Sequence, residues 1–247
     1  MLDGDHRYEL NCDDSCTLAT VGAFRVVAER DLCGQRNESA SSREPDLRHL
    51  CDEGLTRFVT LDNRDRAVAL TKSGRHLLET HRRDCDDSRA QTFYADVRRP
   101  RELSHDAQLY RAYLREEERL RDQGAEIHRV ILEQELKREY QEWLQAHNRG
   151  RPDSDGRPDR DEDEIEEWAR AHDLPYFDQS VHFPDFRIEY ELGGRDQHED
   201  VEIVTEHYRG EHAASVARAG FRCYGRGGGS SRGGGRSVDP RLAEDFV

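Results

Sequence analysis

The sequence predicts an α+β protein made of an N-terminal helical module with one β-hairpin, a helical middle segment and a small C-terminal α/β part with a mixed sheet. Two observations indicate this class. Residues 55–70 hold two short apolar runs separated by turn residues, and residues 185–192 alternate apolar with polar side chains. Both patterns are typical of strands. In the segments between them, apolar residues recur at helical spacing.

The composition limits the classes of partner. The chain has 247 residues and a formal net charge of −15, so any contact with phosphate has to come from a local excess of lysine and arginine. No run approaches the roughly 18–20 apolar residues of a membrane span, and the N-terminus lacks a signal-peptide pattern. We therefore expect a cytoplasmic protein with no membrane contact. The six cysteines form no CxxC pair, which favours reduced thiols over a zinc site.

The first seventy residues favour a series of short elements. A helix is expected over residues 17–32, with Thr17 as its N-cap. A second, short helix over residues 46–52 ends at Gly54. Strands follow at 55–61 and 66–70, joined by the turn residues 62–65, and Thr71 is placed to cap a final helix.

The middle of the chain reads as helical. One helix is expected from Ser104 or His105, and another from about residue 125 to residue 147, both with an apolar stripe. Residues 149–163 form an acidic segment that we expect to be a disordered insertion, leading into a helix over 164–172.

The last part is β-like. The strand over 185–192 is followed by a glycine turn, a return strand over 201–206, a helix over 211–219 and a strand over 221–224. Residues 225–247 are expected to be a glycine-rich flexible tail.

The N-terminal order of elements resembles a known class of DNA-binding module. Short helix, DEGL at residues 52–55, hairpin and LTKSG at residues 70–74 form a string that recurs in winged helix-turn-helix regulators, and the resemblance covers residues 15–83. It implies that the helix at 46–53 enters the major groove of duplex DNA. It also implies that the hairpin tip at 62–65 touches the DNA backbone or the minor groove.

Local charge agrees with this resemblance. Seven basic residues and three acidic ones lie between Thr56 and Arg83, a local excess of +4 in an acidic chain. Arg48 and His49 are candidates for base edges, and the hairpin cations for phosphates. The candidate DNA-binding residues are Arg48, His49, Arg57, Arg64, Arg66 and Lys72. The alternative is a module of the same shape that serves protein contacts or dimerisation.

Two carboxylates carry the second candidate site. Asp185 follows Pro184 at the start of a strand, and Glu202 lies in the next strand. Such a pair can hold a divalent metal that activates water. The layout over residues 104–224 resembles the PD-(D/E)XK nuclease core and, with Ser-His-Asp at 104–106, the replication-relaxation proteins of mobile elements. Under that resemblance Asp185 and Glu202 are the catalytic and metal-binding residues, and Mg²⁺ is the cofactor.

One departure from the nuclease pattern decides how we interpret it. The pattern has a lysine two positions after the glutamate, and Val204 stands there. A valine cannot stabilise charge on an attacked phosphate. The favoured hypothesis is therefore a double-stranded-DNA-binding protein of a mobile element or plasmid, active in replication, mobilisation or transcription control, with a degenerate nuclease-like core and no cofactor. The alternatives are a Mg²⁺-dependent nuclease, and a dimeric regulator or interaction module whose homodimer seam lies in residues 104–147.

Overall fold

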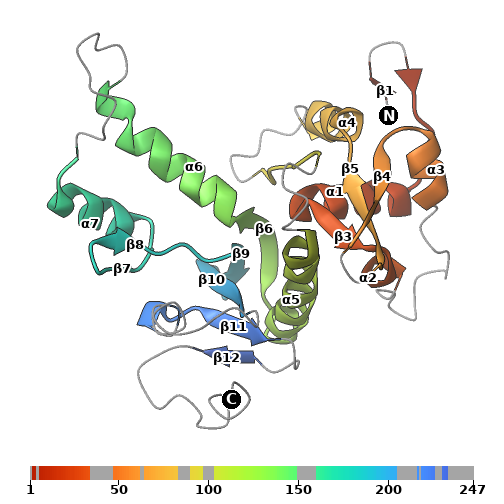
Figure 1. Cartoon of the computed structure of the whole chain (residues 1–247). Coiled ribbons are helices and arrows are strands. Elements are labelled where there is room, and N and C mark those ends of the chain that lie inside the picture. Colours follow the sequence, from red (N-terminus) through yellow and green to blue (C-terminus); the bar gives the residue numbers. More distant parts are fainter. Residues whose placement is uncertain are drawn as a thin grey trace. The chain divides into compact units, whose positions relative to one another are not determined.

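The computed structural model shows a mixed α+β chain that divides into two compact units, residues 1–130 with 190–195 and residues 131–189 with 196–247 (Figure 1). None of the helices in the described part of the chain combines the length and apolar character that a bilayer crossing requires. The structure describes residues 2–3, 6–33, 47–61, 64–82, 90–96, 103–148, 160–204, 216, 218–225 and 230–232.

The first unit contains a three-stranded antiparallel sheet, in the order β3-β5-β4, within a set of helices. Strands β1 (Leu2–Asp3) and β2 (His6–Arg7) precede it as a separate antiparallel pair. In chain order its other elements are α1 (Cys12–Phe24), β3 (Val26–Ala28), α2 (Glu29–Cys33), α3 (Leu47–Asp52), β4 (Thr56–Thr60), β5 (Arg66–Leu70), α4 (Lys72–Arg82) and α5 (Leu103–Asp122).

The predicted hairpin is confirmed. Strands β4 and β5 pair antiparallel from Thr56 opposite Leu70 to Thr60 opposite Arg66. The amide of Leu61 donates to the carbonyl of Asp65, and the amide of Arg64 donates to the carbonyl of Leu61, each at 2.9 Å. Arg64 has a φ of 64°, the left-handed conformation expected of the last residue in a three-residue hairpin loop.

The expected single helix over residues 17–32 is wrong. Helix α1 begins earlier, because Asn11 and Asp14 form a capping box, and it ends at Phe24. Arg25 then takes a φ of 67°, and the next three residues form β3, which pairs with β5. The helical spacing of the apolar residues misled the prediction, since residues 26–28 are buried whichever way they face. Pairing with a strand forty residues away overrides the local pattern.

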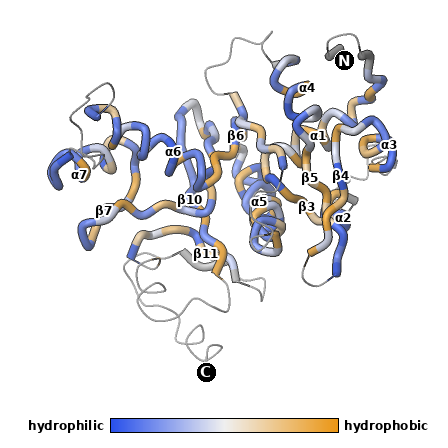
Figure 2. The backbone as a smooth tube through the Cα atoms, turned by 45° about the horizontal axis from the view of Figure 1, so that its top comes forward, coloured by the Kyte–Doolittle hydropathy of each residue, from blue (hydrophilic) through white to orange (hydrophobic). Residues whose placement is uncertain are grey.

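One hydrophobic cluster of the first unit lies between its sheet and α5. Val26, Ala28, Ala67 and Ala69 pack with Leu103 and Ala107, and Figure 2 shows β3 as a hydrophobic stretch. The ring of Phe24 packs against Tyr110 and Tyr113 of α5, with centroids 5.1 and 4.9 Å apart. The apolar stripe of α5, suggested above as a dimer seam, is therefore used for packing inside the chain.

The expected helix over residues 125–147 is also wrong in its first part. Gly124, with a φ of 83°, ends α5, and residues Glu126–Leu132 form strand β6. Within this range the α-helix is Glu133–Leu144, as α6. The β-branched residues Ile127, Val130 and Ile131 favour a strand, and their spacing also fitted a helix face.

A five-stranded mixed sheet, in the order β12-β11-β10-β9-β6, is the main β-structure of the later part of the chain. Strands β10 and β11 are parallel, and β11 and β12 antiparallel. The mixed sheet was predicted. The strands of this sheet after β6 are β9 (Phe186–Leu192), β10 (Arg195–Val204), β11 (Arg222–Gly225) and β12 (Ser230–Arg232). Between α6 and β9 the chain forms η2 (Ala146–Asn148), α7 (Glu162–Ala171) and the separate strand pair β7 (Tyr176–Phe177) and β8 (Ser180–Val181).

The last residues of the expected disordered acidic insertion, 160–163, are ordered and lead into α7. Residues 149–159 lie outside the described residues, but Asp161 and Glu164 form a capping box that starts α7. Arg160 lies over the ring of Trp143 at 4.3 Å and pairs with Glu164. In the glycine-rich tail, Ser230–Arg232 pairs with β11 rather than remaining unpaired, and the remaining tail residues lie outside the described part.

The two glycines of the DEGL and LTKSG strings have structural roles around Leu55. Gly54, with a φ of 70°, ends α3 as predicted. The carbonyl of Leu55 accepts the Thr71 amide at 3.0 Å. The Thr71 hydroxyl lies 2.6 Å from the carbonyl oxygen of Gly54 and 3.0 Å from that of Leu55, and it accepts the amide of Gly74. This confirms Thr71 as the cap of α4. A Cβ on Gly74 would lie 2.2 Å from the carbonyl oxygen of Leu55.

Replacing Gly74 with alanine is expected to lower the free energy of unfolding of the first unit by roughly 1–3 kcal/mol, because the clash is with backbone that cannot rotate away. Ser73→Ala, at an exposed neighbouring position of α4, is the matched control and should change it by less than about 0.5 kcal/mol. Urea unfolding followed by circular dichroism and by hydrogen exchange of the β5 amides measures both. Equal stability of the two variants would contradict the described junction.

Candidate functional site

The candidate base-reading residues lie on α3, which packs through Leu47 and Leu50. Arg48 is exposed on this helix, and none of the ion pairs between described residues involves it. The ring Nε2 of His49 lies 3.2 Å from the carbonyl oxygen of Glu9. Arg48 is therefore open to a partner, whereas His49 contacts the segment that precedes α1.

The two arginines near the hairpin tip have different surroundings. Arg64 is exposed, and it takes part in no ion pair between described residues. Arg66 lies 3.1 Å from Glu29 through its Nε, and its guanidinium lies over the ring of Phe58 at 4.0 Å. Asp65 is paired with Arg30 at 2.8 Å. Arg64 is thus the tip cation that is available to an outside phosphate.

The remaining two candidates, Arg57 on β4 and Lys72 at the start of α4, lie on either side of one carboxylate. Asp96 has one oxygen 3.9 Å from Arg57 Nη2 and the other 4.0 Å from Lys72 Nζ. The side chain of Arg57 is 45% exposed, that of Lys72 is 85% exposed and that of Asp96 is 42% exposed. At this exposure the ion pairs are weak.

The Ser-His-Asp string at 104–106 has a structural partner. The carboxylate of Asp106, which is buried, lies 3.1 Å from Nη1 of Arg25. Arg25 is the C-cap residue of α1 and has a positive φ. The pair therefore ties the first turn of α5 to the junction between α1 and β3, and the sequence contained no local sign of it.

The structure brings Asp185 and Glu202 together. The amide of Asp185 donates to Oε2 of Glu202 at 3.1 Å, and the amide of Ile203 donates to Oδ2 of Asp185 at 2.7 Å. The carbonyl of Asp185 accepts the amide of Glu133, the first residue of α6, at 2.9 Å. Glu202 is 6% exposed. Each carboxylate therefore accepts a backbone amide from the segment that carries the other.

Arg187, two residues further along β9, is fully engaged in the second unit. Its guanidinium forms two hydrogen bonds to the carboxylate of Asp200, at 2.6 and 2.9 Å. It also donates to the carbonyl oxygens of His172 and Asp173, which follow α7. Arg187 thus joins the end of α7 to the sheet. It is not available to take the place of the lysine that the nuclease pattern has at position 204.

Cys223 is the third side chain at this place. It pairs in register with Glu202 across the parallel strands β10 and β11. Burial, with smaller contributions from the negative charges of Glu202 and Asp185, raises the pKa of the Cys223 thiol to about 11. The thiol is therefore neutral at physiological pH.

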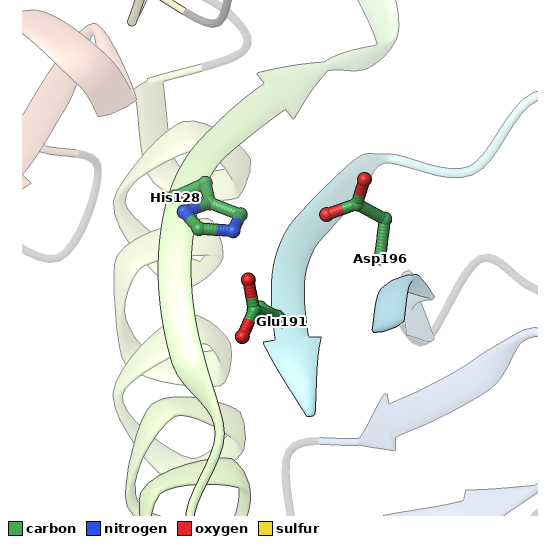
Figure 3. A group of neighbouring side chains, drawn as sticks. All are labelled: His128, Glu191 and Asp196. Atoms are coloured by element: carbon green, nitrogen blue, oxygen red, sulfur yellow. The ribbon is translucent and has the colours of Figure 1, made fainter. Parts of the chain in front are cut away.

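One group of metal-capable side chains occurs among the described residues, and it contains neither Asp185 nor Glu202. It consists of His128 on β6, Glu191 on β9 and Asp196 on β10, whose ligand atoms lie within 4.8 Å of one another (Figure 3). Both carboxylates are exposed. Exposed acidic groups are often close together without an ion, so this grouping alone does not define a metal site.

Comparison of the chain with known protein families, with curated proteins and with solved structures finds no match.

Alkylation of the cysteines tests the environment of Cys223. With a pKa of about 11, about 0.1% of the Cys223 thiol is ionised at pH 8, against roughly a quarter for an ordinary thiol of pKa about 8.5. We expect iodoacetamide at pH 8 to label the exposed Cys12 and Cys16 at least tenfold faster. Glu202→Gln removes one negative charge and should speed labelling of Cys223. Mass spectrometry gives each rate, and equal rates at Cys223 and Cys12 would contradict the described burial.

Proposed function

We propose that the protein binds double-stranded DNA through its first unit, as a winged helix-turn-helix module, and that its C-terminal part is a nuclease-like core without activity. The order helix, strand, two helices, hairpin and helix supports the first half, together with the β3-β5-β4 sheet. In such a module α3 lies in the major groove and the hairpin tip lies against the DNA backbone or the minor groove.

One observation carries this proposal more than the others. Arg64 is an exposed cation at the tip of a closed hairpin turn, outside every ion pair between described residues. In a chain of net charge −15, an arginine held away from the chain's own carboxylates is the group that can meet a phosphate. Arg48 on α3 shares this property.

Replacing Arg64 with asparagine tests the proposal without straining the turn, because asparagine tolerates a φ of 64°. We expect duplex DNA binding to weaken roughly fivefold in about 0.1 M salt, similarly across sequences, and the salt dependence to fall by about 0.9, the value for one lost phosphate contact. Arg64→Lys should restore most of both. Fluorescence anisotropy titrations at several salt concentrations measure these quantities.

Two comparisons make the Arg64 result specific. Arg170→Asn removes an equal charge from an exposed position on α7 and should leave affinity unchanged. Arg66→Ala should weaken binding less than Arg64→Asn, since Arg66 is engaged by Glu29 and Phe58. If wild type and Arg64→Asn bound duplex DNA with the same affinity, the proposed binding of DNA by the first unit would be wrong.

A second candidate function is a Mg²⁺-dependent nuclease, and the observation in its favour is the pairing of Asp185 with Glu202. Each carboxylate accepts a backbone amide from the segment that carries the other, which places two acidic side chains at one end of β9 and β10. Two features weigh against it. Val204 stands in place of the expected lysine, and Arg187 on the neighbouring strand β9 is held by Asp200 and two carbonyls.

We therefore expect no metal-dependent nicking of supercoiled plasmid by the purified protein with Mg²⁺ or Mn²⁺. The reference is Glu202→Gln, whose amide oxygen can still accept the Asp185 amide and so preserves the local fold. Agarose gel analysis of nicked product should show the same background for both proteins. Nicking by wild type that Glu202→Gln abolishes would establish the nuclease instead.

A further inference from the structure

Arg57 and Lys72 together resemble a binding site for an anion, and the carboxylate of Asp96 occupies it. Arg57 and Lys72 lie 3.9 and 4.0 Å from the two oxygens of a single carboxylate. Their charges sum to +2, and Asp96 leaves a residual charge of +1. The two cations come from β4 and from the first position of α4, so the sheet and the helix each contribute one of them.

The backbone holds Asp96 at this position independently of the ion pairs. The amide of Asp96 donates to the carbonyl of Leu70 at 3.0 Å, and the amide of Tyr94 donates to the carbonyl of Gly22 at 2.8 Å. The ring of Phe93 packs so closely on Gly22 that an added Cβ there would lie 2.9 Å from it. Residues 90–96 are thus a strap anchored on the first unit, and Asp96 is the acidic residue at its described end.

The ion pairs that Asp96 makes are loose. All three side chains are between 42% and 85% exposed, and both distances lie near the upper limit for an ion pair. An exposed pair of this kind shifts an equilibrium by about fivefold at most. A phosphodiester carries the same charge as Asp96 and offers the same pair of acceptor oxygens. It can therefore exchange with Asp96 at small cost.

We propose that Arg57 and Lys72 form one binding site for a backbone phosphate of duplex DNA, and that Asp96 occupies this site as an internal competitor that lowers affinity. The inference rests on the proposed DNA-binding function and adds a specific phosphate subsite to it. It also explains why two cations predicted to contact DNA face a carboxylate of their own chain.

The test is a double-mutant cycle on the full chain, with duplex binding measured by anisotropy in about 0.1 M salt. Asp96→Asn keeps a residue suited to the left-handed φ of 57° and removes only the charge. We expect it to tighten binding by about three- to fivefold. In a background of Arg57→Ala with Lys72→Ala the same change should have no effect. Thermal melts by circular dichroism check that each variant is folded.

Glu118→Gln is the matched control, because Glu118 is exposed on α5 and the substitution changes the net charge equally. Tightening by Glu118→Gln equal to that by Asp96→Asn would overturn the inference, as would a gain that persists without Arg57 and Lys72. If the affinity for DNA falls in Arg64→Asn but is unchanged in Asp96→Asn, this inference is rejected and the proposed function is not. No binding by any variant would reject the proposed function with it, whereas binding by Asp96→Asn alone would support both.

Discussion

The carbonyl oxygen of Leu55 determines how the hairpin of the first unit meets its last helix. It accepts the amide of Thr71, whose hydroxyl lies 2.6 Å from the neighbouring carbonyl oxygen of Gly54, and the absence of a side chain at Gly74 lets α4 approach it. Gly54 supplies the left-handed turn that brings α3 to the same point. Because three elements converge on one peptide group, their relative directions are fixed by hydrogen bonds rather than by apolar packing alone.

The same junction places the cations of the candidate interface. Arg57 lies two residues after Leu55 and Lys72 one residue after Thr71, so the bonds between Leu55 and Thr71 bring the two charges to one carboxylate. Asp96 is anchored to the carbonyl of Leu70, the residue before Thr71. The two cations, the strap of residues 90–96 and the hairpin are therefore positioned by the same short stretches of backbone. The two glycine-containing strings, 52–55 and 70–74, lie at this junction.

Local chemistry predicts the elements around the hairpin, although it did not reveal the capping box of Asn11 and Asp14. Gly54, Thr71 and the two strands of the hairpin follow from turn and capping preferences. Strands β3 and β6 were taken for helix, because apolar residues such as Val27 and Val130 fit either period, and only a partner strand decides between them. The basic candidates could be identified from composition, whereas their partners Asp96 and Glu29 lie far away in sequence.

The two candidate sites differ in how easily their charged groups can change partners. Asp185 and Glu202 accept backbone amides from each other's strands, and Glu202 is nearly buried, so a metal would have to compete with hydrogen bonds that hold β9 against β10. Replacing such bonds is costly inside a protein. Arg57, Arg64 and Lys72 lie in solvent with weak partners or with none among the described ion pairs. A binding surface needs charges that exchange partners at low cost, and in this chain those charges belong to the hairpin and α4 rather than to the carboxylate pair.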